Sequence, residues 1–190
     1  MIAGTALLER AINYTLGSLR VVTPAALCRT TPCADWNLQE LLDHVNDAFQ
    51  ALSEAASGQI TPNPPPPHAP NPNPALALRD GARELLGRWT GMLTSDPILI
   101  ADRHLTSPMV AAVGAIEITI HGWDVSKACG EHHPIPPLMA EELLDLALLF
   151  ITRSDRPARF ASPLTVPPCA PAQDHLLAYL GRDPDWRPHP

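Results

Sequence analysis

Apolar residues recur every three or four positions along most of this chain, which is the period of an amphipathic α-helix. In the first segment, for example, Leu8, Ile12 and Leu19 belong to one such stripe. Strand-like alternation is weak, and residues 98–105 fit a strand or a loop equally well. The pattern therefore predicts an all-α protein. The predicted helices span residues 4–22, 38–57, 75–93, 109–129, 137–152 and 172–180.

Some helix boundaries carry signals of their own. Asn37 and Glu40 stand three positions apart before an apolar run, as in a capping box that satisfies the free N–H groups of a first helical turn. Between the second and third helices, residues 60–74 are so rich in proline that they predict a stiff connector without helix. Four long amphipathic helices joined in part by long connections indicate a four-helix bundle.

Length and composition limit the possible functions. A chain of 190 residues suffices for one sizeable core, expected here in residues 1–153, with residues 154–190 as a short proline-rich extension packed on the bundle. The net charge of −7 argues against a surface for nucleic acid or anionic membranes. The first residues lack the layout of a signal peptide, and no uninterrupted apolar run reaches about 18 residues. We therefore expect a soluble, cytoplasmic protein.

One set of side chains combines suitable chemistry with a suitable position. Glu117 and His121 stand four residues apart, so they share one face of a helix with apolar neighbours. His44 lies at the edge of the apolar stripe of the second helix and is expected to point inward. A buried glutamate needs a partner that neutralises its charge. A divalent metal bound by His44, Glu117 and His121 would provide that charge, while a hydrogen-bonded glutamate–histidine pair fits the bare spacing at least as well.

Asp124 follows His121 by three residues and lies near the same helix face. It could be a fourth ligand or an acceptor for an imidazole N–H, and it could equally be a surface residue. Trp36 and Trp123 could line a pocket beside the site, although their apolar neighbours favour packing in the core.

Other reactive residues give weaker signals. The cysteines form no C-x-x-C pair, so free thiols are expected, not disulfides or a zinc–thiolate site. Two histidines are left open as candidates (His104 and His175), and the others are expected to be exposed (His68, His132, His133 and His189). No nucleophile elbow, Gly-rich phosphate loop or H-E-x-x-H is present. The cysteines are Cys28, Cys33, Cys129 and Cys169.

Four phrases of the sequence resemble a known family. They are PCADWNLQELLDH (residues 32–44), AIEITIHGWDV (115–125), APAQD (170–174) and LGRDP (180–184). Together they are similar to the DinB-like metal-binding family related to mycothiol-dependent maleylpyruvate isomerase, and they lie in the family's order along nearly the whole chain.

The resemblance implies a DinB-like four-helix bundle with a metal at one end of its core, bound by His44, Glu117 and His121. Zinc is the favoured ion, with nickel, iron and manganese as alternatives. Relatives use a low-molecular-weight thiol such as mycothiol, so mycothiol is a candidate cofactor here. The chain departs from maleylpyruvate isomerase in its tail, because the segment after Thr152 is too short for that enzyme's separate C-terminal domain.

Three functional hypotheses follow. The first is a metal-dependent thiol S-transferase or isomerase that acts on a small electrophilic metabolite, with Glu117 and Asp124 as the catalytic residues. The second is a metal-free binding protein or pocket catalyst of specialised metabolism in the same cavity, with Glu117 or His44 as acid or base. The third is a structural or regulatory protein without a reaction. The expected partner is a small molecule, neither nucleic acid nor membrane, and a homodimer is possible.

Overall fold

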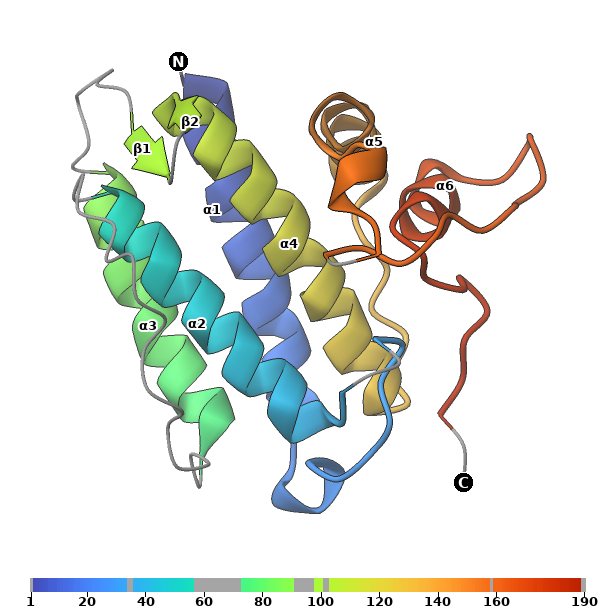
Figure 1. The fold of residues 1–190 in the computed structure, drawn as a ribbon. Coiled ribbons are helices and arrows are strands. Elements are labelled where there is room, and N and C mark those ends of the chain that lie inside the picture. The colour runs from blue at the N-terminus through green and yellow to red at the C-terminus, as the bar shows by residue number, and fades with distance from the viewer. Residues whose placement is uncertain are drawn as a thin grey trace.

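The protein is a helical bundle with a short strand pair, seen in a computed structural model. The structure describes residues 2–33, 36–56, 73–90, 98–100, 103–157 and 159–188. The α-helices are α1 (Ile2–Ser18), α2 (Leu38–Ala56), α3 (Pro74–Thr90), α4 (Ser107–Ala128), α5 (Pro137–Phe150) and α6 (Ala172–Tyr179) (Figure 1). Short 3₁₀ helices are η1 (Leu19–Val21), η2 (Pro24–Ala26) and η3 (Arg153–Asp155). The two strands described are β1 (Ile98–Ile100) and β2 (Arg103–Leu105).

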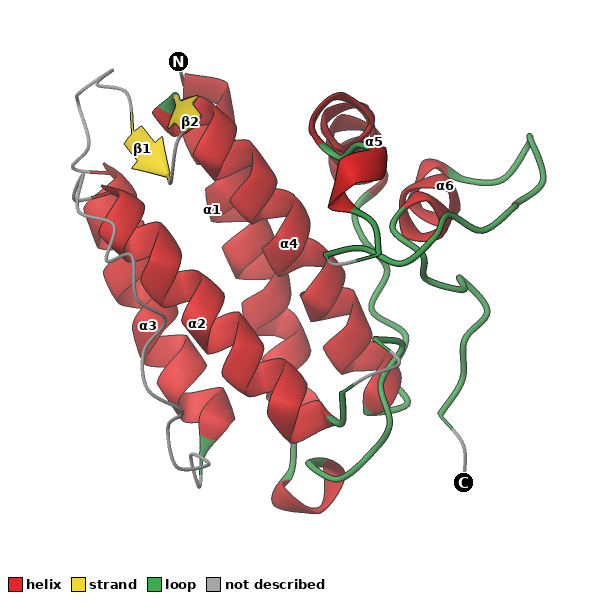
Figure 2. Ribbon diagram, viewed as in Figure 1, coloured by secondary structure: helices red, strands yellow, loops and turns green. Residues whose placement is uncertain are grey.

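Helices α1 to α4 form the four-helix bundle. α4 packs on α1 and α2, and α2 also packs on α3 (Figures 1 and 2). Because α4 touches several neighbours, it is apolar on most of its surface, and residues such as Ala111, Ile116 and Ile120 are buried. A polar side chain on α4 is therefore held inside the protein, where it needs a partner.

α1 and α4 approach each other closely beside the later part of α4. The hydroxyl of Thr15 donates to the carbonyl of Ile118 at 2.7 Å. A Cβ atom added to Gly122 would lie only 2.4 Å from the Thr15 hydroxyl oxygen. The missing side chain of Gly122 thus lets the two helices meet one residue after His121, which fixes that part of α4 in the bundle.

The sequence pattern predicted these elements well. Each predicted helix is present, with ends that move by only a few residues. The capping box is confirmed, because the amide of Glu40 donates to Asn37 Oδ1 at 3.0 Å and the amide of Asn37 donates to Glu40 Oε2 at 2.8 Å. The undecided segment 98–105 contains the antiparallel pair β1 and β2. Of the predicted connector, residues 60–72 lie outside the described residues, and Pro74 begins α3 instead of ending the connector.

The segment after the bundle packs against it. α5 contacts α4, and α6 contacts α5 (Figures 1 and 2). Beyond α6 the chain passes α4 again, where Lys127 donates to the carbonyl of Pro184 at 3.3 Å. Leu176, Leu177 and Leu180 are buried. None of the described helices is long and apolar enough to cross a membrane.

Candidate metal centre

The predicted ligands converge between α2 and α4. Nε2 of His44 lies 3.0 Å from Oε1 of Glu117, and Nε2 of His121 lies 3.2 Å from the same oxygen. One ligand atom from each residue falls within 4.8 Å of the others. α2 carries His44, whose side chain is partly exposed, and one turn of α4 carries both Glu117 and His121. The prediction that these three side chains meet is therefore confirmed.

Glu117 is ionised in this arrangement. Burial by itself would raise the pKa of Glu117, but hydrogen bonds and charge from His121 and His44 outweigh burial and hold that pKa well below the ordinary carboxyl range. About a quarter of its side chain is exposed (26%), as is about a third of His44 (34%). The carboxylate thus lies where a ligand from solvent can reach it.

His121 is held on both sides of its ring. Its side chain is only 5% exposed, and its Nδ1 lies 3.0 Å from Oδ2 of Asp124. Burial would lower the pKa of His121, but hydrogen bonds to Asp124 and Glu117 outweigh burial and raise the pKa to about 9. Because an ionised Asp124 can only accept, Nδ1 of His121 donates, and Nε2 is directed at Glu117.

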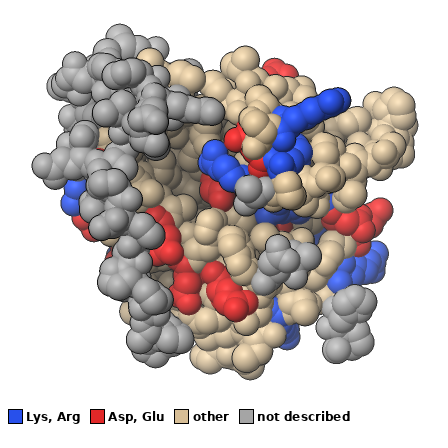
Figure 3. Space-filling model, viewed as in Figure 1, with Lys and Arg blue, Asp and Glu red and all other residues tan. Residues whose placement is uncertain are grey.

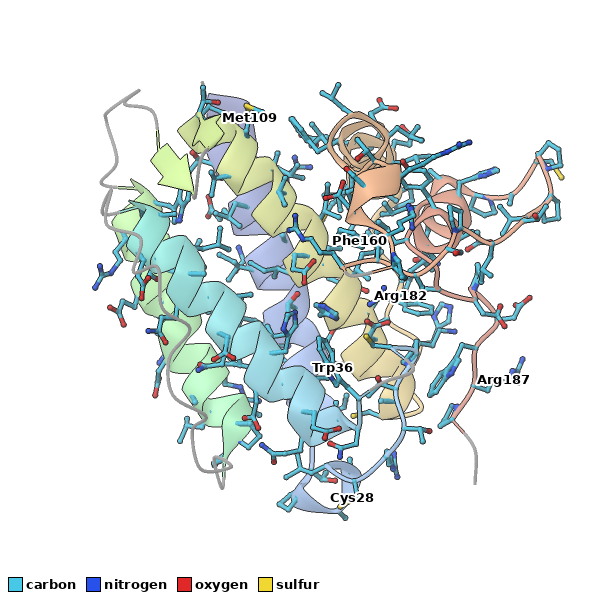
Figure 4. The ribbon with its side chains drawn as sticks, viewed as in Figure 1. Cys28, Trp36, Met109, Phe160, Arg182 and Arg187 are labelled. Carbon is cyan, nitrogen blue, oxygen red and sulfur yellow. The ribbon has the colours of Figure 1, made fainter. Side chains whose placement is uncertain are left out.

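Asp124 is fully buried and is not a surface residue. Its Oδ2 also accepts from Nη2 of Arg182 at 3.1 Å, and Arg182 is itself buried. Burial would raise the pKa of Asp124, but the charge of Arg182 and the hydrogen bond from His121 outweigh burial and lower it. Arg182 follows α6, so the C-terminal segment supplies part of the centre (Figure 4).

Arg182 was not identified as a site residue from the sequence. It lies in the LGRDP phrase, which carried the family resemblance, but a phrase does not say which helix its arginine will reach. The sequence offered only the position of this arginine directly after Gly181. In the structure, Gly181 has a φ of +79° and turns the chain after α6.

Trp36 lies against the two imidazoles. Its ring centroid is 4.4 Å from that of His44 and 6.0 Å from that of His121. Figure 4 shows Trp36 near the end of the bundle where α2 begins. The sequence favoured core packing for both tryptophans. Trp123 is buried in the core at 2% exposure, whereas Trp36 is partly buried, packs against the core and also borders the site.

Among the described residues, no other histidine belongs to this cluster. His132 is exposed as predicted, but His133 is half-buried, because its ring stacks on Tyr14 with centroids 4.6 Å apart. His175 lies on α6 and has no part in the cluster. The backbone of His104 pairs with Leu99 in the strand pair. His68 and His189 lie outside the described residues.

Exposed acidic side chains lie along α2, the helix that carries His44. Figure 3 shows acidic side chains there, and Glu40 and Asp47 are exposed. A negative surface raises the local concentration of cations.

A separate cleft of about 400 Å³ lies between α2 and α3, lined in part by Asn46 and Phe49. None of the three converging side chains lines this cleft.

The residues present suit a divalent metal ion. Two imidazole nitrogens and a carboxylate oxygen are ligands that zinc and similar ions bind. Two atoms bound to a tetrahedral zinc at about 2.0–2.1 Å stand about 3.3 Å apart, close to the 3.0 and 3.2 Å between Glu117 and its two histidines. Asp124 occupies the place of a hydrogen-bond acceptor behind a histidine ligand. The same distances also allow direct hydrogen bonds in the metal-free protein.

Comparison with known proteins gives a family for the chain. Two proteins of Mycobacterium tuberculosis are similar to it: Uncharacterized protein MT0763 of strain CDC 1551 / Oshkosh and Uncharacterized protein Rv0738 of strain ATCC 25618 / H37Rv. Each is 25% identical over 154 residues, which cover 80% of this chain and 82% of the relative. No solved structure matches the chain.

The family match covers the bundle and its centre. Residues 8–126 match the domain described as the mycothiol maleylpyruvate isomerase N-terminal domain. This range contains His44, Glu117, His121 and Asp124, and it ends before Arg182. Since the match spans more than half of the chain and all three converging side chains, the protein belongs to the family of the mycothiol maleylpyruvate isomerase N-terminal domain.

Proposed function

We propose that the protein is a metal-dependent enzyme that uses a low-molecular-weight thiol of the mycothiol type to transfer or isomerise a small electrophilic metabolite. The observation that carries this proposal is the convergence of His44, Glu117 and His121 within 4.8 Å. The family supports the thiol, because its description names mycothiol and an isomerase. Zinc is the favoured ion on ligand chemistry.

His44, Glu117 and His121 would hold the ion. When bound, a divalent ion in this place lowers the pKa of a coordinated thiol, so that the thiolate exists at neutral pH. This chemistry needs no catalytic cysteine from the protein, and Cys28 and Cys169 are exposed. The partial exposure of His44 and Glu117 leaves a side on which a small molecule can approach.

The chain's own residues prepare the centre. Asp124 accepts a hydrogen bond from the Nδ1–H group of His121. In the neutral ring, this leaves the lone pair on Nε2, which would face the metal. Arg182 compensates the charge of Asp124 in the interior. We therefore assign Asp124 a positioning role. Glu117 touches the reacting region directly, as a ligand or as a proton acceptor.

The metal can be tested on protein purified without an affinity tag. After supplementation, we expect about one equivalent of bound metal in the wild type and far less in His44→Ala, since structural and catalytic zinc sites depend on each of their ligands. Chelator should lower the melting temperature of the wild type and leave His44→Ala unchanged. Identical wild-type melting curves with chelator and with added zinc, manganese, nickel or iron(II) would contradict the proposal.

The metal-free alternative has one observation in its favour. Hydrogen bonds run without a break from Asp124 through His121 and Glu117 to His44, which suits an acid–base group with a perturbed pKa. A thiol-consumption assay of the wild type with chelator and with added metal separates the two proposals. Turnover that is lost with chelator and returns with metal supports the metal enzyme, and turnover that is the same in both supports the alternative.

A further inference from the structure

The two histidines of the centre are held in different ways. His121 has a hydrogen-bond partner for each ring nitrogen, Glu117 on Nε2 and Asp124 on Nδ1. His44 is more exposed, and in the described part of the chain only its Nε2 has such a partner, Glu117. Among the described residues, therefore, no carboxylate or carbonyl does for His44 what Asp124 does for His121.

An aromatic ring takes that place. Trp36 packs on His44 with ring centroids 4.4 Å apart and an angle of 37° between the planes. The same indole lies 6.0 Å from the ring of His121, and the two imidazoles meet edge to face at 5.0 Å. Packing against a rigid indole restricts rotation of the His44 side chain, which would otherwise be free to turn toward solvent.

Hydrogen bonds of its own backbone hold Trp36 in place. Its amide donates to the carbonyl of Cys33 at 3.0 Å, and its carbonyl accepts from the hydroxyl of Thr31, a buried residue, at 2.9 Å. The next residue, Asn37, is locked in the capping box with Glu40. The loop before α2 thus fixes the indole relative to the helix that carries His44.

We propose that Trp36 is the positioning residue of His44, and that its indole holds the imidazole in the orientation in which Nε2 faces Glu117. The proposal rests on the proposed metal-binding function, because it concerns how a ligand is oriented. It differs from the role of Asp124 in its physics: His121 is oriented by a hydrogen bond and His44 by stacking.

The test compares Trp36→Leu with Trp36→Phe. Leucine keeps apolar volume but removes the ring, whereas phenylalanine keeps a ring. By analogy with residues that support metal ligands, Zn²⁺ affinity in a chelator competition should fall about tenfold or more in Trp36→Leu and stay within about threefold of the wild type in Trp36→Phe. Trp186→Leu is the matched control, since Trp186 is also partly buried but contacts no histidine ring in the described structure. His44→Ala gives the background from binding elsewhere.

A second measurement needs no metal. In the metal-free wild type, NMR signals of the His44 ring protons should carry the ring-current shift of an adjacent indole, and this shift should vanish in Trp36→Leu and persist in Trp186→Leu. Unchanged His44 signals in Trp36→Leu, or unchanged Zn²⁺ affinity in a wild type that binds the ion, would overturn the role of Trp36. Wild-type protein that binds no Zn²⁺ but shows the expected shifts would refute the metal function and leave the orienting contact in place.

Discussion

At the scale of single residues, the candidate centre is a line of hydrogen bonds that runs from Arg182 through Asp124, His121 and Glu117 to His44. Charges of opposite sign alternate along its buried part. Taking each ion out of water is costly, and the pairing offsets this cost only while every partner is present. Removal of one of these side chains should therefore lower the free energy of unfolding by more than the lost contact contributes, because its partner is left buried with an uncompensated charge.

Arg182→Met provides the first prediction. The change removes one of the two cations that pair with Asp124, a side chain of 0% exposure, and leaves only His121 beside it. The free energy of unfolding should therefore fall by about 3 kcal/mol, the lower end of the usual loss for a broken buried ion pair. Urea denaturation measures it. Arg187→Met, at an exposed position of the same segment, should change stability by less than about 0.5 kcal/mol. Equal effects of the two variants would show that Arg182 is not part of a buried ion pair.

The second prediction concerns pH in the metal-free protein. His121 keeps its proton when folded up to about pH 9, whereas its ordinary pKa is 6.5. Its contribution to stability is therefore fully present below pH 6.5 and is lost as pH rises toward 9, by up to about 3 kcal/mol. Glu117 and Asp124 act with the opposite sign, because their pKa values are lowered and their contribution is lost in acid.

The loss of stability at high pH can be tested by urea denaturation of chelator-treated protein between about pH 6 and 9.5, with the free energy of unfolding measured at each pH. His121→Asn should flatten the slope, even though it lowers stability overall. A wild type whose stability is constant or increases over this range would contradict a folded-state proton on His121.

Residue chemistry was only partly readable from the sequence. The spacing of Glu117 and His121 within one helix fixes their common face, so this pair could be predicted. His44 joined them because its stripe position pointed inward. Arg182 could not be found in this way, since its contact with Asp124 joins residues 58 positions apart, and helical periodicity carries no information about which distant segment returns to a helix.

At the scale of elements, the start of α2 connects helix capping to the centre. Asn37 caps the helix that carries His44 and directly follows Trp36. Asn37→Ala should lower the free energy of unfolding by about 1 kcal/mol, the usual loss for a helix cap. Because the cap also anchors the indole, the variant should bind Zn²⁺ more weakly as well.

Thermal or urea unfolding and Zn²⁺ competition on the same samples test this third prediction. Asn37→Asp is the control, because aspartate also caps a helix and should keep both properties. Reduced stability with unchanged affinity would mean that the loop holds Trp36 without help from the cap.

The elements themselves were predictable where local chemistry decides them. The apolar period and the Asn37–Glu40 pair located α2, and Gly130, at a φ of +80°, follows α4. The strand pair was undecidable because its short strands offer too little periodicity, and each strand depends on contacts with the other. His133 was misjudged for a related reason: its stacking on Tyr14 joins a loop to α1.

At the scale of the whole molecule, the family match and the structure divide the chain differently. The match ends at residue 126, before α5 and α6. Yet Arg182 from beyond α6 reaches the buried Asp124 of α4, and Lys127 reaches the carbonyl of Pro184. We predicted a bundle over residues 1–153 with a packed extension, and these contacts suggest that the bundle and the extension depend on each other.

Deletion of residues 172–190 provides the last prediction. It removes α6 and Arg182 together, so the truncated protein should be less stable than Arg182→Met, because the buried leucines of α6 are lost as well as the ion pair. Asp124→Asn distinguishes the two causes. In the full chain, Asp124→Asn leaves Arg182 buried without its anion and should lower the free energy of unfolding by about 3–5 kcal/mol. In the truncated chain Arg182 is absent, so the same change should lower the free energy of unfolding much less. Urea denaturation of the full chain and the truncated chain, each with and without Asp124→Asn, gives the cost of this change in both backgrounds. The same cost in both backgrounds, or a truncated protein as stable as the full chain, would show that the extension is not part of the centre.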